Sequence, residues 1–186
     1  MNHLPQDAVL IVIDVQRAFE HPSWGQRNNV GAEASIAALL AAWRAGARPL
    51  IHVHHRSQRR ESLFHVDAPG LAVKPEAQPL PGETVIYKDV NSCFIGTDLE
   101  QRLRARGAST LVIVGLTTDH CVSTTTRMAG NLGFTTFLVA DATATFERVG
   151  PDGARFTAEQ MHATALASLH QEFATIVDSA AVLRAL

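Results

Sequence analysis

The sequence is poor in lysine and cysteine. Its 16 basic residues include only two lysines, Lys74 and Lys88, and it has only two cysteines, Cys93 and Cys121. Two cysteines argue against a disulfide-rich secreted scaffold, and their spacing fits neither a CxxC redox pair nor a four-ligand zinc site. We therefore expect two free thiols, and we expect residues this scarce to have specific roles.

The sequence also lacks an excess of one charge and any long apolar run. Its net charge is −2. The chain therefore lacks the basic surplus that would indicate nucleic acid or an anionic membrane as a partner. The longest apolar runs, such as residues 8–13, are far shorter than the roughly 20 residues that span a bilayer. Residues 1–7 have no charged segment leading into an apolar stretch and a cleavage site. We therefore expect a cytoplasmic protein without a secretory signal.

Several catalytic signatures are missing as well. The chain has no GxSxG elbow, no HExxH, no GxxxxGK[ST] loop, and no GxGxxG after its first apolar run. These absences argue against nucleophile-elbow serine hydrolases, HExxH zinc enzymes, P-loop proteins and dinucleotide-binding enzymes. The 46% hydrophobic content of the 186 residues is enough for a full core. The length predicts one domain, residues 1–186.

Short apolar runs rich in β-branched residues alternate with longer amphipathic stretches. The predicted strands are 9–14, 49–54, 84–87, 110–115, 135–140 and 174–177, and the predicted helices are 29–45, 97–106, 121–132, 158–170 and 179–186. Runs such as 111–114 are apolar at every position, which is typical of strands buried on both faces of a parallel sheet. The alternation predicts a three-layer, Rossmann-like α/β fold. We expect the irregular stretch 56–82 to be a lid or an oligomer contact.

Three polar residues follow predicted strands, where parallel sheets bind their ligands. Asp14 ends the first strand, Lys88 follows the third, and Cys121 lies six residues after Gly115. Taken singly, each residue also has an ordinary structural explanation. Asp14 is typical of a turn, Lys88 of a solvated lysine, and Cys121 of a small core residue. Together they have a chemical logic, because a thiol attacks as thiolate and a helix N-terminus or a cation lowers its pKa of about 8.5. Lys88 would supply the cation, and Asp14 would accept the thiol proton.

Three segments resemble the isochorismatase-like cysteine hydrolase superfamily: 11–19 (IVIDVQRAF), 85–94 (with VIYK and NSCF) and 114–122 (VGLTTDHCV). The resemblance continues through 130–134 and 140–143 and covers nearly the whole chain. It implies a six-stranded parallel sheet between helices, a homo-oligomer (dimer or tetramer), and Asp14, Lys88 and Cys121 as catalytic triad. It also implies a cis peptide bond between Leu116 and Thr117. That bond would aim the backbone N–H groups of Thr117 and Cys121 at one oxyanion.

Three histidines, His52, His54 and His55, invite a metal interpretation, because neutral imidazole is a common ligand. The nicotinamidase branch of the superfamily binds a divalent metal through an aspartate and histidines after the second strand. Here His52 stands where that aspartate is expected, and no Trp-His-Pro segment follows. We expect no metal and no cofactor, with a structural or pocket-lining role for the histidines, and a metal site as the alternative.

The substrate pocket is predicted to be lined by Phe19, Trp24, His55 and Phe94. Core packing is an equally good interpretation of the aromatic rings. Trp24 lies in the turn-like segment 21–25, which we expect to form a flap. Cys93 is close enough in sequence to Phe94 to line the pocket too. We expect Lys74, in the proline-rich stretch, to be solvated.

The leading hypothesis is a hydrolase that cleaves an amide or related C–N bond of a small molecule through a thioester on Cys121. One alternative is hydrolysis of a vinyl ether, as in isochorismatase itself, which needs no cysteine nucleophile. Another is a non-catalytic member that binds a metabolite or a partner protein. Arg17, Arg56 and Arg127 are candidates for pairing with a substrate carboxylate, although each is equally compatible with a solvated position.

Overall fold

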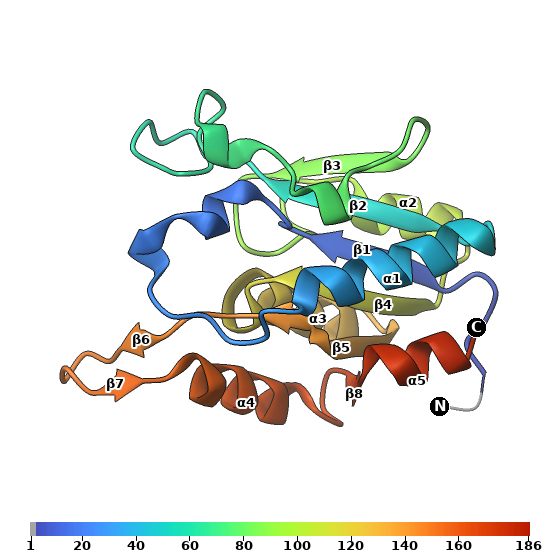
Figure 1. Ribbon diagram of the computed structural model, residues 1–186. Helices are drawn as coiled ribbons and strands as arrows, with labels where there is room; N and C mark the ends of the chain where they lie inside the picture. The colour runs from blue at the N-terminus through green and yellow to red at the C-terminus, as the bar shows by residue number, and fades with distance from the viewer. Residues whose placement is uncertain (1–2) are drawn as a thin grey trace.

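A fully parallel, six-stranded sheet forms the centre of the computed structural model, which describes residues 3–186 (Figure 1). The strands are β1 (Val9–Ile13), β2 (Leu50–His55), β3 (Thr84–Lys88), β4 (Thr110–Leu116), β5 (Thr135–Ala144) and β8 (Thr175–Val177). Their order is β3-β2-β1-β4-β5-β8. The chain moves outward from β1 to β3, returns to β4 beside β1, and then moves outward the other way. This reversal makes the carboxyl ends of β1 and β4 the expected binding position.

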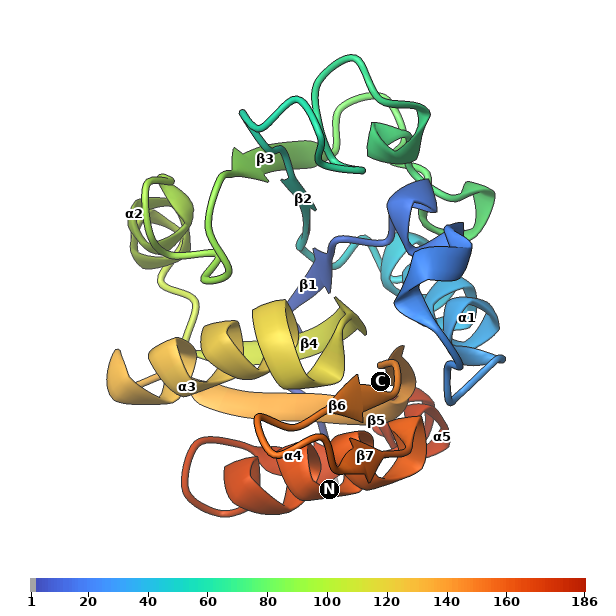
Figure 2. The same cartoon turned by 90° about the vertical axis from the view of Figure 1, so that its left-hand side faces the viewer.

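Helices cover both faces of this sheet. The helices α1 (Ala32–Ala45) and α5 (Ser179–Arg184) pack on one face, and α2 (Leu99–Ala105), α3 (Ser123–Asn131) and α4 (Ala158–Leu169) pack on the other. Figure 2 shows α1 separated from α2 and α3 by the sheet. The predicted three-layer α/β fold with a six-stranded parallel sheet is therefore confirmed.

The central strand β1 explains why the sheet needs both layers. All five of its residues are buried. Ile11 and Ile13 belong to the core shared with α2 and α3, whereas Leu10 and Val12 belong to the core shared with α1. Successive side chains of a strand point to opposite faces, so a run that is apolar at every position is stable only between two covering layers.

The structure departs from the predicted elements in two places. Strand β5 continues to Ala144, beyond the predicted end at residue 140, after its pairing with β4 shifts register between Ile113 and Gly115. A small antiparallel pair, β6 (Arg148–Val149) and β7 (Arg155–Phe156), follows it. Strands of two residues are too short to show an alternation of apolar and polar positions, so the pattern gave no signal for them.

The irregular stretch 56–82 contains two short 3₁₀ turns, Pro69–Leu71 and Pro75–Ala77. It contacts the segment that follows β1, where the Arg17 N–H donates to the Ala72 carbonyl at 2.8 Å and the Lys74 N–H donates to the Val15 carbonyl at 3.0 Å. Among the helices that residues 3–186 form, none combines the length and the apolar character needed to cross a membrane. The cytoplasmic location stays a prediction.

His52 and His54 lie side by side on one face of β2, with ring centroids 6.1 Å apart. The Nε2 atom of His52 pairs with Glu83 at 3.0 Å. Neither ring nitrogen of His54 has a partner among the described residues, and this side chain is 2% exposed. Burial, with smaller contributions from His52 and Lys88, lowers the pKa of His54 to about 4.

Acid should therefore destabilise the fold through His54. In the unfolded chain this imidazole binds a proton below about pH 6.5, whereas the folded chain resists protonation until about pH 4. The stabilisation is thus present above pH 6.5 and is lost as the pH falls toward 4. We expect the free energy of unfolding to drop by about 2 kcal/mol more in the wild type than in His54→Leu between pH 8 and pH 5. Urea titrations at both pH values measure this.

The matched control is His3→Gln, which replaces an exposed histidine and should leave the pH dependence of the wild type unchanged. Identical pH dependence in His54→Leu and in the wild type would contradict the assignment.

Candidate active site

A buried ion pair joins the ends of two strands that are not neighbours. Asp14 directly follows β1, Lys88 ends β3, and β2 lies between them. The Lys88 Nζ atom donates to Asp14 Oδ2 at 2.7 Å, with side-chain exposures of 0% and 1%. The second oxygen, Asp14 Oδ1, is buried and has no partner among the described residues. It is therefore free to accept a proton or a hydrogen bond from a third group.

The third group is the thiol of Cys121, which is 9% exposed. This residue lies in a π-helical turn, Thr118–Val122, that leads from β4 into α3. One carboxylate oxygen of Asp14, one ring nitrogen of His55 and the Sγ atom of Cys121 all lie within 4.8 Å of one another. Three residues far apart in the sequence are thus brought together at the expected edge of the sheet.

The electrostatics of the site differ from the prediction in one respect. Burial and the Asp14 carboxylate raise the pKa of the Cys121 thiol above its usual range, and Lys88 only partly opposes them. Burial acts to lower the pKa of Lys88, whereas the negative charge of Asp14 acts to raise it, and the net result is a raised pKa. The sequence favours a lowered pKa for this thiol of Cys121, whereas its buried position beside Asp14 raises the pKa. The raised pKa favours a neutral Cys121 thiol beside the ion pair of Lys88 and Asp14.

The peptide bond between Leu116 and Thr117 is cis. The carbonyl of Thr117 accepts hydrogen bonds from the N–H groups of His120 and Val122, each at 3.2 Å. The backbone N–H of Thr117, in contrast, has no acceptor within residues 3–186. Thr117 lines the same cavity as Cys121, which makes this N–H a candidate donor to a ligand.

A cavity of about 150 Å³ opens at this point. It is lined by Asp14, Phe19, Trp24, His55, Phe64, Asn91, Thr117, His120 and Cys121. Three of the four predicted pocket residues, Phe19, Trp24 and His55, are thus among its walls. Sequence reasoning missed Phe64, which lies in the irregular stretch with no periodic pattern around it. It also missed Asn91, which lies within the segment 85–94 that carried the resemblance.

Two predicted neighbours of the pocket lie in the core instead. Phe94 stacks on Phe134 with ring centroids 6.1 Å apart, and it is not among the residues that line the cavity. Cys93 is fully buried, and burial raises its pKa to about 12. Its backbone N–H donates to Thr125 Oγ1 at 3.1 Å, which turns this segment toward α3. Both cysteines are free, as expected.

The roof of the cavity is a short aromatic segment after β1. It consists of two 3₁₀ turns, Arg17–Glu20 and Pro22–Trp24. The ring of Phe19 lies 5.0 Å from that of Trp24 and 5.1 Å from that of Phe64. We call residues 17–28, which include the segment 21–25 that we expect to form a flap, the flap. Its aromatic rings keep the cavity dry on one side.

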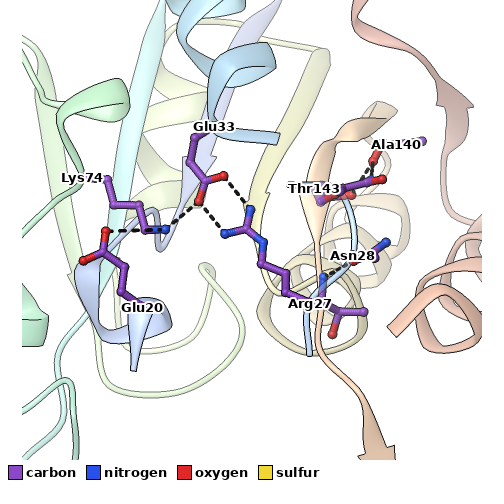
Figure 3. Close-up of polar contacts among 9 residues, drawn as sticks. Glu20, Arg27, Asn28, Glu33, Lys74, Ala140 and Thr143 are labelled. Carbon is purple, nitrogen blue, oxygen red and sulfur yellow. Dashed lines mark hydrogen bonds and ion pairs between the residues drawn. The ribbon is translucent and has the colours of Figure 1, made fainter. Parts of the chain in front are cut away.

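A second buried ion-pair network anchors the flap (Figure 3). Arg27 binds both carboxylate oxygens of Glu33 at 2.7 and 2.6 Å, and Lys74 Nζ binds Glu33 Oε1 at 2.7 Å. Burial acts to raise the pKa of Glu33, but these two cations outweigh it and lower the pKa to about 2. Lys74 is 6% exposed, so the expectation that it is solvated is wrong. It joins the proline-rich stretch to α1 and, through Glu33, to the flap.

The turn that carries Cys121 is fastened on both sides. Asp119 accepts hydrogen bonds from Thr145 Oγ1 and, at 3.2 Å, from Arg148 Nε. Thr118 Oγ1 pairs with His162 Nδ1 of α4 at 2.9 Å. Sequence reasoning missed these partners, because Thr145, Arg148 and His162 lie 26 to 44 positions after the residues of the turn that they bind.

Asp14, His55 and Cys121 are the one group of potential metal ligands that lies close together within residues 3–186. A thiolate, an imidazole and a carboxylate suit zinc by type. Lys88 Nζ, however, lies 2.7 Å from Asp14 Oδ2 and 3.4 Å from the Nδ1 atom of His55, and its positive charge opposes a cation there. The absence of a metal stays a prediction.

Arg17, Arg56 and Arg127 are not among the residues that line the cavity. The guanidinium of Arg56 lies over the ring of Tyr87 at 5.3 Å. Arg127 donates to Ser168 Oγ at 2.9 Å. None of the three arginines is therefore placed to bind a carboxylate inside this cavity.

The comparisons with known proteins agree along nearly the whole chain. Residues 8–181 match the isochorismatase domain family. The isochorismatase family protein YrdC of Bacillus subtilis is 47% identical over 174 residues, which cover 94% of this chain and 93% of YrdC. RutB of Methylobacterium radiotolerans, a ureidoacrylate amidohydrolase, is 30% identical over 218 residues, which cover 98% and 80% of the two chains.

Among solved structures, an isochorismatase-family protein from Chromobacterium violaceum superposes with a TM-score of 0.97. Its sequence is 45% identical, and the match covers 100% of this chain and 96% of that one.

The first prediction from the site concerns Glu33. Changing Glu33→Gln leaves the buried cations of Arg27 and Lys74 without their shared anion. We expect the free energy of unfolding to fall by about 3 kcal/mol, as is typical when one partner of a buried pair is removed. The control Glu100→Gln removes an exposed pair with Arg104 and should cost less than about 0.5 kcal/mol. Equal losses in the two variants, measured by urea titration, would contradict the structural role of Glu33.

The second prediction concerns the state of the thiol. Because its pKa is raised, alkylation of Cys121 by iodoacetamide should accelerate steadily from pH 6 to pH 9 without a plateau. Mass spectrometry of Cys93→Ala, which keeps only Cys121, measures this rate. The Cys121→Ala protein, which keeps only the buried Cys93, should stay unmodified. A rate that is already constant between pH 6 and pH 7 would reveal a preformed thiolate instead.

Proposed function

The chain belongs to the isochorismatase family of hydrolases, and from this premise we propose that it cleaves an amide or related C–N bond of a small molecule. The observation that carries the proposal is the meeting of the Cys121 thiol with Asp14, beside a buried ammonium, at the wall of a cavity. The similarity to RutB, whose name describes an amidohydrolase, supports this reaction class.

In the first step, the Cys121 sulfur attacks the carbonyl carbon while its proton passes to the free Oδ1 atom of Asp14. This general-base transfer is required because the thiol is neutral at rest. The carbonyl oxygen becomes an oxyanion, and the backbone N–H groups of Thr117 and Cys121 donate to it. Asp14 then gives the proton to the substrate nitrogen, the C–N bond breaks, and the amine leaves a thioester on Cys121.

In the second step, water attacks the thioester carbonyl and gives one proton to Asp14. The tetrahedral intermediate collapses, the C–S bond breaks, and the proton on Asp14 returns to the sulfur. In each of the two steps, Asp14 takes up one proton and then releases it. The cycle therefore returns the site to its starting state and releases an amine and a carboxylic acid.

Lys88 is proposed to act through charge and position. Its raised pKa keeps the ammonium protonated through the cycle. Bound to Asp14 Oδ2, it holds the carboxylate in one orientation and leaves Oδ1 to exchange protons with Cys121 and with water. The ammonium also offsets the negative charge that develops on sulfur in the dry site.

The test compares two substitutions in the triad. Replacing Cys121→Ala removes the nucleophile and should lower the kcat for amide hydrolysis by at least about 10³-fold, with no acyl-enzyme in the mass spectrum. Replacing Asp14→Asn removes the base and should lower kcat by about 10²–10⁴-fold with little change in KM.

The control is Cys93→Ala, which should retain activity, because Cys93 lies in the core. Thermal unfolding of each variant separates a lost fold from lost chemistry. Full activity of a folded Cys121→Ala protein would refute the mechanism.

A further inference from the structure

Resting on the proposed function, we propose that the substrate is an amide with an uncharged acyl side chain of up to about six non-hydrogen atoms. Its leaving amine is a polar group that faces the outside. The proposal follows from the walls of the inner cavity and from a second, polar hollow that adjoins it.

The size limit comes from the inner cavity. Its volume is about 150 Å³, which is comparable to an apolar cavity that holds one benzene molecule. Phe19, Trp24 and Phe64 form its apolar walls. Glu33 and its two cations anchor the flap that carries the first two rings, so this roof does not widen without breaking a buried network. A long acyl chain has no room in this cavity.

The charge limit comes from what the walls contain. No lysine or arginine is among the nine residues that line the inner cavity. Burial, with help from Lys88, lowers the pKa of His55 and keeps its imidazole neutral at pH 7. The ammonium of Lys88 is already paired with Asp14 and is fully buried behind it. A substrate carboxylate would lose its water there without gaining a cation, which is strongly unfavourable.

The orientation comes from the outer hollow, which has a volume of about 460 Å³. His55 and Asn91 border both spaces, so the two adjoin. Its other walls are Ser57, Arg59, Glu61, Ser62 and Asp89, all polar. The amine departs while the acyl group is still bound to Cys121, and water must then reach the thioester. The leaving group therefore faces this hollow, and the acyl side chain occupies the inner cavity.

The experiment uses a matched pair of amides. In 4-methylpentanamide the acyl side chain ends in an isopropyl group, and in succinamate a carboxylate with the same number of non-hydrogen atoms replaces it. Each amide competes with p-nitrophenyl acetate for acylation of Cys121, followed by release of p-nitrophenolate. The concentration that halves this rate reports binding whether or not the amide is itself cleaved. We expect succinamate to bind at least about 100-fold more weakly.

Two further compounds test size and orientation. Lengthening the acyl side to octanamide should weaken binding by at least about 10-fold. Lengthening the nitrogen side, as in N-(2-hydroxyethyl)-4-methylpentanamide, should change binding by less than about threefold. Equal binding of succinamate and 4-methylpentanamide, or tolerance of the long acyl chain, would overturn this inference and leave the proposed function standing.

A variant pair links the selectivity to the cavity wall. His120 lines the cavity with a side chain that is 50% exposed, so a longer side chain fits at this rim. His120→Arg adds a permanent cation and should improve binding of succinamate relative to 4-methylpentanamide by about 10-fold, whereas His120→Gln should leave the ratio unchanged. An unchanged ratio in a folded His120→Arg protein would count against the inference. If p-nitrophenyl acetate fails to acylate Cys121 in the wild type, the proposed function itself is refuted.

Discussion

The buried pair of Asp14 and Lys88 is the constraint on which the rest of the site depends. Its 2.7 Å contact requires β1 and β3 to end at the same level on either side of β2. A lone charge at either position would be strongly destabilising in a core this dry, so the two residues are useful only together. Parallel pairing through β2 provides the alignment, with Ile13 opposite Val53 and His55 opposite Lys88. The sheet thereby determines which carboxylate oxygen stays free for chemistry.

Both lysines of the chain are buried in ion pairs, and this shared environment gives their scarcity a structural meaning. Lys88 binds Asp14, and Lys74 holds Glu33, which in turn holds Arg27 and the flap. One network thus fixes the floor of the site, and the other fixes its roof. The turn that carries Cys121 lies between them and is fastened separately, through Thr118 and Asp119. The floor, the roof and the turn that carries Cys121 are thus each held by their own contacts, so the position of one does not depend on the contacts of the others.

Much of the fold could be predicted, and so could the meeting of Asp14, Lys88 and Cys121 at one edge of the sheet, because these signals are local. Apolar runs mark the buried strands, and the residues that follow β1 and β3 need only that placement to be recognised as site residues. The positions of Lys74, Phe64 and Phe94 could not be predicted, since each depends on how an irregular segment folds back against distant residues. Glu33 binds Lys74 from 41 positions away, and no periodicity in the stretch 56–82 indicates that contact.

The pKa of Cys121 shows why a motif alone does not determine chemistry. A helix start and a neighbouring cation predict a thiolate, yet burial and the carboxylate beside the thiol raise its pKa. The cation is already bound by Asp14, so the thiol experiences the pair rather than a free positive charge. A neutral thiol reacts slowly with alkylating agents near pH 7, because only the thiolate is the nucleophile. In the proposed mechanism, a bound carbonyl makes the proton transfer from Cys121 to Asp14 favourable, which would couple attack on the substrate to occupancy of the cavity.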